Sequence, residues 1–126
     1  MRRLLAAAAL ALLSLSTQAL ADRALIVGID IYQDATLTFP LPGASRADSE
    51  RIHNLLTGTL GYREDDIKIL RDVEATRQNI LEGLTSWLSG IEPGEKVFFY
   101  YVGHGHFTKD LNGDEPDGID ETPGPL

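Results

Sequence analysis

The chain has 126 residues, with 19 Asp or Glu against 11 Lys or Arg, a formal net charge of −8 and no cysteine. An acidic chain repels phosphate backbones and anionic lipids, which disfavours nucleic acid and an anionic membrane surface as main partners. The cysteine count excludes disulfides, thiolate zinc sites and a cysteine nucleophile within these residues.

Residues 1–21 are predicted to be a secretory signal peptide. Arg2 and Arg3 give a positive start, Leu4–Leu15 an apolar stretch and Ala19–Ala21 a small-x-small cleavage site. The apolar stretch, roughly 12 residues, is shorter than the about 20 that a bilayer span needs. A membrane anchor or a buried core helix is the weaker alternative. We therefore expect an exported protein, periplasmic or secreted, with no membrane attachment after cleavage.

The remaining residues, 22–126, form at most one modest domain. Cleavage leaves 105 residues (126 − 21) and 9 Lys or Arg (11 − 2), so the formal charge becomes −10 (9 − 19). A chain of this size buries a small fraction of its surface and supports a single core.

The first predicted elements are a strand and a helix. Ala24–Ile29 is a continuous apolar run rich in branched residues, which is typical of a strand buried on both faces. A loop follows over about Asp30–Gly43, long enough to line a site. Helical spacing then predicts a helix that ends near Gly58 or Gly61, with these residues on its core side: Ala44, Ala47, Ile52, Leu55 and Leu56.

Two further strands and a second helix follow. Ile67–Leu70 predicts a short strand, and Val97–Val102 a third one. Between them Thr76 can cap a helix whose apolar residues recur three or four apart: Ile80, Leu84, Trp87, Leu88 and Ile91. Strands and helices that alternate in this way predict an α/β fold with a parallel sheet and helices on its faces.

Beyond Lys109 the apolar periodicity ends. A sheet of three parallel strands would leave exposed edges and a poorly covered core. We therefore expect residues 22–126 to be the front part of a longer domain, or a domain that a partner completes.

His104 is the first candidate for chemistry, because it follows the third strand and lies between Gly103 and Gly105. Ligands of parallel sheets gather at the carboxyl ends of strands, and the loop after the first strand, with Asp30 and Tyr32, opens onto the same edge. An imidazole titrates near neutrality and suits proton transfer, and the flanking glycines give conformational freedom and room for a substrate. The Gly105 amide could face a developing oxyanion. The alternative is a histidine that ends a strand and makes local hydrogen bonds.

The acidic stretch from Asp110 to Glu121 suggests hard-metal ligands. Its acids partly match a calcium-loop template, but Glu115 stands where that template needs glycine and no helix precedes it, which excludes an EF-hand. Calcium in another geometry and a solvated loop without metal both stay open. A transition-metal site at His104 and His106 is a weak third possibility.

Asp48 in the first predicted helix and Asp72 after the second strand are the other notable acids. Either could order a site near the strand ends, although solvation at the surface is favoured for any single acid.

Several motifs in this order resemble the metacaspase and caspase-like peptidases, clan CD cysteine proteases of peptidase family C14. The central match is Tyr-Tyr-Val-Gly-His-Gly at 100–105, followed by the acidic stretch. Supporting matches are Ala-Leu-Ile-Val-Gly-Ile at 24–29 with Tyr32 after it, Leu-Pro-Gly-Ala at 41–44 leading to Asp48, Leu-Gly-Tyr at 60–62 and Ala-Thr-Arg-Gln-Asn-Ile at 75–80.

The resemblance covers Arg23 to about Glu121. It implies a three-layer caspase-haemoglobinase-like fold with a mostly parallel sheet, incomplete in this chain, whose β-α-β-α-β order is that of the family's large-subunit half.

The resemblance also implies an activity and a set of site residues. A cysteine and histidine dyad would hydrolyse peptide bonds in peptide or protein substrates, with His104 as general acid and base and Gly105 in the oxyanion hole. Asp48 would lie in the primary specificity pocket. Calcium is the one candidate cofactor. Asp120 matches a position that resembles a calcium ligand of the family, and Asp117 and Glu121 are the candidate ligands beside it.

The family's nucleophilic cysteine follows a fourth strand that these residues do not include, so we expect this chain to be inactive alone. Val102 stands where the family commonly has a serine in the specificity pocket, so cleavage after Arg or Lys, typical of metacaspases, does not follow. Two other hypotheses remain. One is a non-catalytic module that binds a partner or calcium through the acidic loop, and the other is a metallohydrolase using His104 and His106.

Overall fold

The computed structural model describes residues 22–38 and 43–124, so the predicted signal peptide lies outside the described residues. Three strands form a parallel sheet in the order β2-β1-β3: β1 Arg23–Gly28, β2 Ile67–Arg71 and β3 Val97–Val102. Ala24 of β1 pairs with Ile67 on one side and with Phe98 on the other. The α/β class and the parallel sheet predicted from the sequence are confirmed.

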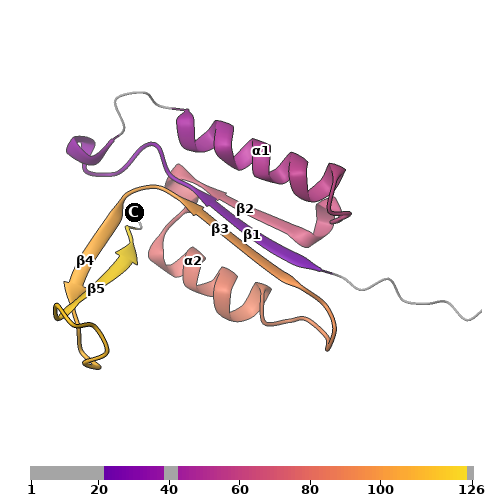
Figure 1. Ribbon diagram of the computed structural model, residues 1–126. Helices are drawn as coiled ribbons and strands as arrows, with labels where there is room; N and C mark the ends of the chain where they lie inside the picture. The colour runs from indigo at the N-terminus through magenta and orange to yellow at the C-terminus, as the bar shows by residue number, and fades with distance from the viewer. Residues whose placement is uncertain (1–21, 39–42, 125–126) are drawn as a thin grey trace, which may run out of the picture.

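β1 forms the centre of the core because it is buried on both faces. Leu25 and Val27 point to one face, where they pack with residues of α2 (Arg77–Glu82) and the turn after it. Ala24 and Ile26 point to the other face, where Leu56 of α1 (Ala44–Gly58) covers them. Figure 1 shows the two helices on opposite sides of the sheet. The apolar run of β1 is therefore continuous because neither face meets water.

The second helix begins as predicted and then widens. The Thr76 hydroxyl accepts the Asn79 N–H at 3.2 Å, which is the predicted cap. After Glu82 the chain makes a π-helical turn over Gly83–Trp87, in which the Leu88 N–H donates to the Gly83 carbonyl at 2.9 Å. A Cβ atom on Gly83 would lie 2.7 Å from the Leu25 side chain, so the helix approaches β1 closely here.

Trp87 anchors that turn to the start of β1. Its indole Nε1–H donates to the Ala24 carbonyl at 3.0 Å, and the Arg23 guanidinium lies 5.0 Å from the centre of its ring. Leu84, an apolar residue of the predicted helical pattern, is exposed instead. Within the described ranges no helix is long and apolar enough to cross a membrane.

A β-hairpin follows β3, although the sequence pattern predicts no regular element beyond Lys109. β4 (Gly105–Lys109) and β5 (Ile119–Pro123) pair antiparallel, with Gly105 opposite Pro123. The Asp110 carboxylate closes the connecting loop by accepting amides from this segment: Asn112 at 3.0 Å, Gly113 at 2.6 Å and Glu115 at 3.2 Å. The acidic stretch is thus an ordered connection, not an open-ended loop.

Two buried or strained carboxylates join the carboxyl ends of the strands. Asp30, 4% exposed, accepts the first amides of α1, from Ser45 at 2.8 Å and Arg46 at 3.1 Å. Asp72 follows β2 with a φ of +42°, and its carboxylate accepts the amides of Asp30 at 2.9 Å and Ile31 at 3.0 Å. Of the two roles open for Asp72, ordering the strand ends is therefore the one observed.

The charge of Asp30 contributes to stability. Burial raises the pKa of its carboxyl, but the hydrogen bonds from Ser45 and Arg46 outweigh burial, so the pKa lies below its ordinary value. The unfolded chain then binds a proton more readily than the folded chain. The stabilisation is present above about pH 4 and is lost as the pH falls through the folded-state pKa.

We expect Asp30→Ala to lower the free energy of unfolding by about 1–3 kcal/mol at pH 7, because the Ser45 and Arg46 amides at the start of α1 lose their acceptor. Asp30→Asn should also flatten the acid limb of the stability profile, as measured by urea unfolding between pH 7 and pH 2. Asp65→Asn is the control, since Asp65 is exposed and its nearest cation, on Arg63, is 4.0 Å away. An acid limb unchanged by Asp30→Asn would contradict this account.

Candidate active site

His104 lies directly after β3, at the carboxyl edge of the sheet, and is half-buried. Its Nε2 lies 2.6 Å from the carbonyl oxygen of Leu37, in the short 3-10 turn Ala35–Leu37 of the loop after β1. A carbonyl oxygen can only accept, so Nε2 is the donor in this hydrogen bond. The loop after β1 and the histidine therefore share one edge, as the sequence predicts.

Two tyrosines fix the backbone of His104. Its N–H donates to the hydroxyl oxygen of Tyr32 at 2.6 Å, and its carbonyl accepts from the Tyr101 hydroxyl at 2.7 Å and the Gly124 N–H at 2.8 Å. The rings of Tyr32 and His104 are 5.1 Å apart and tilted by 55°. Burial, followed by the hydrogen bond with Tyr32, raises the pKa of the Tyr101 phenol, so it stays protonated and able to donate.

The two glycines beside His104 do not serve the conformational freedom expected of them, since neither has a positive φ. A Cβ atom on Gly103 would lie 2.7 Å from the hydroxyls of both Tyr32 and Tyr101, so Gly103 allows a close approach. A Cβ atom on Gly105 would have the Thr122 carbonyl as its nearest neighbour, at 4.0 Å. Conformational freedom is thus the wrong reason for both glycines, whereas the room expected at Gly105 is present.

The amide of Gly105 faces away from the hairpin. The bond from the Gly124 N–H to the His104 carbonyl makes this a hydrogen-bonded position of the antiparallel pair. Hydrogen-bonded and non-hydrogen-bonded positions alternate, so the next pair, Gly105 and Pro123, belongs to the second kind. The Gly105 N–H is consequently directed outward.

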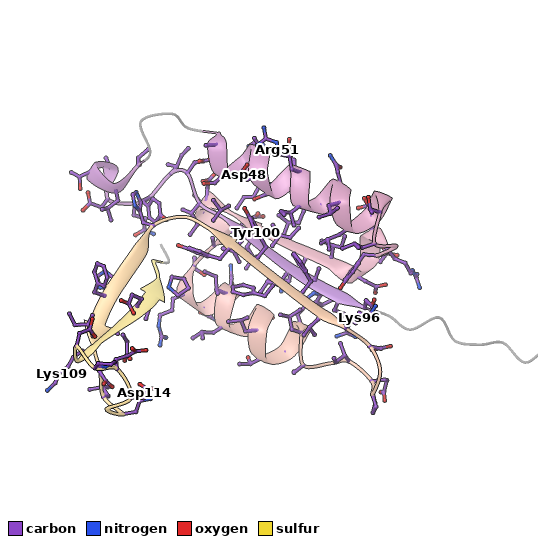
Figure 2. The ribbon with its side chains drawn as sticks, in the orientation of Figure 1. Asp48, Arg51, Lys96, Tyr100, Lys109 and Asp114 are labelled. Carbon is purple, nitrogen blue, oxygen red and sulfur yellow. The ribbon has the colours of Figure 1, made fainter. Side chains whose placement is uncertain are left out.

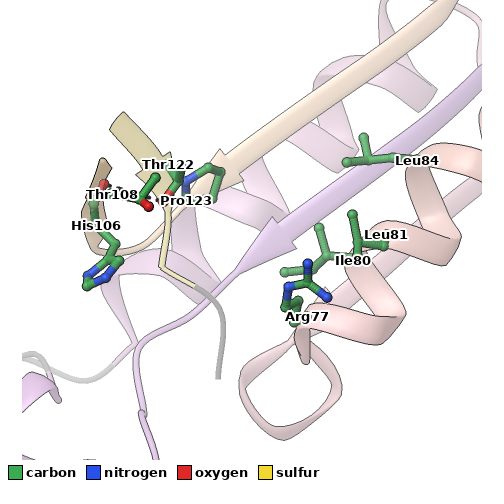
Figure 3. A pocket seen from close by; sticks show the side chains of 8 residues that line it. All are labelled: Arg77, Ile80, Leu81, Leu84, His106, Thr108, Thr122 and Pro123. Atoms are coloured by element: carbon green, nitrogen blue, oxygen red, sulfur yellow. Dashed lines mark hydrogen bonds between the residues drawn. The ribbon is translucent and has the colours of Figure 1, made fainter. Parts of the chain in front are cut away.

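A cavity of about 340 Å³ joins these groups, lined by Tyr32, Leu37, His104, Gly105, His106 and Gly124. The imidazole and the Gly105 backbone thus border one space. A second cavity, of about 520 Å³, lies between α2 and the hairpin (Figure 3), lined by Arg77, Ile80, Leu81, Leu84, His106, Thr108, Thr122 and Pro123. It contains neither His104 nor Gly105, so the smaller cavity is the candidate active site.

The other predicted site residues lie elsewhere. Asp48 lies on α1 and pairs with the Arg51 guanidinium at 2.6 Å (Figure 2). It lines neither cavity described above. Its side chain is 42% exposed, so it is a partly solvated surface acid that already has a cationic partner.

The acids that lie close together in the hairpin are not the calcium ligands predicted from the sequence, except for one. The carboxylates of Asp110, Asp114 and Asp120 lie within 4.8 Å of one another, and this is the group of potential metal ligands among the described residues. The carboxylate of Asp117 accepts the Ile119 N–H at 3.1 Å. Glu121 follows Asp120 in β5 and points to the opposite face. The predicted and observed sets therefore share Asp120.

Sequence reasoning gave no role to the Leu37 carbonyl or the Tyr101 hydroxyl, and placed Tyr32 only near the site. The carbonyl has no signal in the sequence, because any residue supplies one. The tyrosines have a weak signal, since a buried phenol needs a hydrogen-bond partner. Tyr101 stands at the end of a strand, three residues before His104, where such a partner is within reach.

Known proteins match this arrangement. A family model described as metacaspase, peptidase C14 domain, matches residues 22–126. Metacaspase-1 of Schizosaccharomyces pombe is 37% identical over 110 residues, covering 82% of this chain and 25% of that protein. Metacaspase-1 of Saccharomyces cerevisiae is 36% identical over 118 residues, covering 82% and 26%. The chain thus spans about a quarter of the length of these curated relatives.

The fold has a counterpart among solved structures. A crystal structure of a Geobacter sulfurreducens protein matches with a TM-score of 0.60 and 27% identity, over 83% of this chain and 40% of that one. The family match covers every element that carries the site, from β1 to the hairpin. On this evidence the chain belongs to the metacaspase, peptidase C14 family of cysteine peptidases.

Proposed function

We propose that this chain supplies the histidine half of a caspase-like cysteine endopeptidase, with His104 as general base and acid. The observation that carries the proposal is the bond between His104 Nε2 and the Leu37 carbonyl, at the cavity that Gly105 also lines. This bond leaves Nδ1 as the basic nitrogen.

The proposed reaction follows the usual covalent course. Nδ1 of His104 takes the proton of a cysteine thiol, and the thiolate attacks the carbonyl carbon of the scissile peptide bond. The outward Gly105 N–H donates to the oxyanion, and the imidazolium returns its proton to the leaving amine. Water then hydrolyses the acyl-enzyme. Throughout, the Leu37 carbonyl stabilises the imidazolium through a charge-assisted hydrogen bond.

The thiol must come from residues outside these 126, which hold no cysteine. The chain alone is accordingly proposed to be inactive. Asp48 remains our proposal for a substrate-binding acid. Its exposed pair with Arg51 is of the kind worth about 0–1 kcal/mol, so a cationic substrate side chain could displace the arginine. The predicted export places the reaction in the periplasm or outside the cell.

A chimera tests the role of His104. In Schizosaccharomyces pombe metacaspase-1, the segment that matches this chain would be replaced by residues 22–126, and peptide hydrolysis would be measured. We expect His104→Ala to lower kcat about 100-fold or more, since general acid-base catalysis contributes 10²–10⁴-fold.

The matched control is His53→Ala, because His53 lies on α1 and pairs with Glu64 at 2.7 Å, away from the cavity. This variant should keep the kcat of the unmodified chimera. Full activity of the His104→Ala chimera would rule the proposed role out. The unmodified 126-residue chain should hydrolyse none of the same peptides.

We also propose that the acids of the hairpin bind a calcium ion. Calcium binds oxygens at 2.3–2.6 Å, so ligands on opposite sides of the ion are about 5 Å apart, and the carboxylates of Asp110, Asp114 and Asp120 fit that limit. Amide hydrogen bonds, that from Gly113 first, lower the pKa of the Asp110 carboxyl and keep it ionised. Bound calcium would offset two of these three negative charges and stabilise the hairpin that begins with Gly105.

Calorimetric titration of the purified chain with calcium should give binding in roughly the 10⁻⁴–10⁻³ M range. Asp114→Asn should weaken binding about tenfold or more, which is about 1.4 kcal/mol. Glu121→Gln, a change of the same charge on the other face of β5, should leave binding intact. Weaker binding in Glu121→Gln but not in Asp114→Asn would favour the ligand set predicted from the sequence. No heat of binding with the unmodified chain would end the calcium proposal.

A further inference from the structure

The peptide groups on both sides of His104 are held by phenols from different parts of the chain. Tyr32 comes from the loop after β1 and accepts the His104 N–H at 2.6 Å. Tyr101 comes from β3 itself and donates to the His104 carbonyl at 2.7 Å. Each phenol therefore fixes one of the two peptide planes that meet at the histidine Cα.

The second plane also contains the Gly105 amide. A peptide bond is planar and trans, so the His104 C=O and the Gly105 N–H point in opposite directions. The hydroxyl of Tyr101 and the Gly124 N–H bind that carbonyl at 2.7 Å and 2.8 Å and so set the direction of the amide. These two hydrogen bonds thus orient the His104 backbone and the proposed oxyanion donor together.

The two phenols are themselves held firmly. Tyr32 is 6% exposed and belongs to the core cluster on the α2 side of the sheet, and Tyr101 packs against that cluster. Gly103 lets both hydroxyls approach the chain, since a Cβ atom there would lie 2.7 Å from each. The Tyr32 ring also lies against the imidazole, at 5.1 Å. These contacts leave the His104 backbone little freedom to rotate.

We propose that Tyr32 and Tyr101 are positioning residues for His104, which hold its imidazole against the Leu37 carbonyl in the Nε2–H form and aim the Gly105 amide. The inference rests on the proposed function, because it gives the two phenols a part in the work of the same histidine. Neither phenol takes or gives a proton in the reaction. Their contribution is to keep the imidazole within reach of its partners before substrate binds.

Nuclear magnetic resonance of the full 126-residue chain tests the positioning without any activity. With ¹⁵N-labelled histidine, the wild-type ring should show the two well-separated shifts of a single Nε2–H tautomer. In Tyr32→Phe and Tyr101→Phe these shifts should move toward each other as the tautomers mix. Exchange of the His104 amide hydrogen should also be at least about tenfold faster in Tyr32→Phe, as expected for loss of about 1.4 kcal/mol of protection.

Tyr100→Phe is the matched control, because Tyr100 neighbours Tyr101 on β3 but packs on the α1 side of the sheet. It should leave the His104 shifts unchanged. Unchanged shifts in both folded Tyr32 and Tyr101 variants would overturn the inference. An even mixture of tautomers in the wild-type chain would also overturn it, even if the variants fail to fold.

The chimera separates this inference from the proposed function. There, Tyr32→Phe and Tyr101→Phe should lower kcat about 10- to 100-fold with KM unchanged, since a small misplacement of a catalytic group costs rate and not binding. An active His104→Ala chimera would remove the proposed function while the spectra still report on the positioning. Altered spectra with an unaltered kcat in both variants would overturn the positioning role alone.

Discussion

The hydrogen bonds that Asp72 accepts from the amides of Asp30 and Ile31 join the ends of β2 and β1, and the site depends on that junction. Asp30 in turn accepts the first amides of α1, so the same junction sets where the helix begins. Tyr32 follows directly and holds His104 at the end of β3. Buried or partly buried carboxylates and phenols thus connect all three strand ends to one helix.

This arrangement explains how so small a sheet can hold a histidine firmly. Exposed charge pairs contribute little, because water and salt screen them and long side chains lose entropy. The hydrogen bonds at the strand ends instead join buried or partly buried Asp and Tyr side chains to backbone groups. These side chains have few rotatable bonds and so lose little entropy on ordering. The left-handed φ of Asp72 has a conformational cost, and the hydrogen bonds that its carboxylate accepts from two backbone amides offset it.

The sequence predicts the elements whose signal is local. The apolar run of β1, the presence of α1, the Thr76 cap and the strand that leads to His104 all follow from neighbouring residues. The predicted core side of α1 is wrong at Ala44 and Leu55, which are exposed, whereas Ser45 and Ser49 are buried. Sequence prediction fails where distant residues meet. The hairpin pairs β4 with β5 across residues 110–118, and Asp120 joins Asp110 and Asp114 only because β5 folds back on β4. The Leu37 carbonyl belongs to the backbone, which residue types do not encode.

The two glycines beside His104 carry separate information, although they look like one motif. Position 103 is closed by the fold, since a single methyl group there would meet the hydroxyls of Tyr32 and Tyr101. Position 105 is open, and a methyl group there would meet no atom nearer than 4.0 Å. In related sequences a residue larger than glycine at position 103 would therefore indicate that the two tyrosines are replaced or packed differently. At position 105 it would indicate only a changed space for ligands.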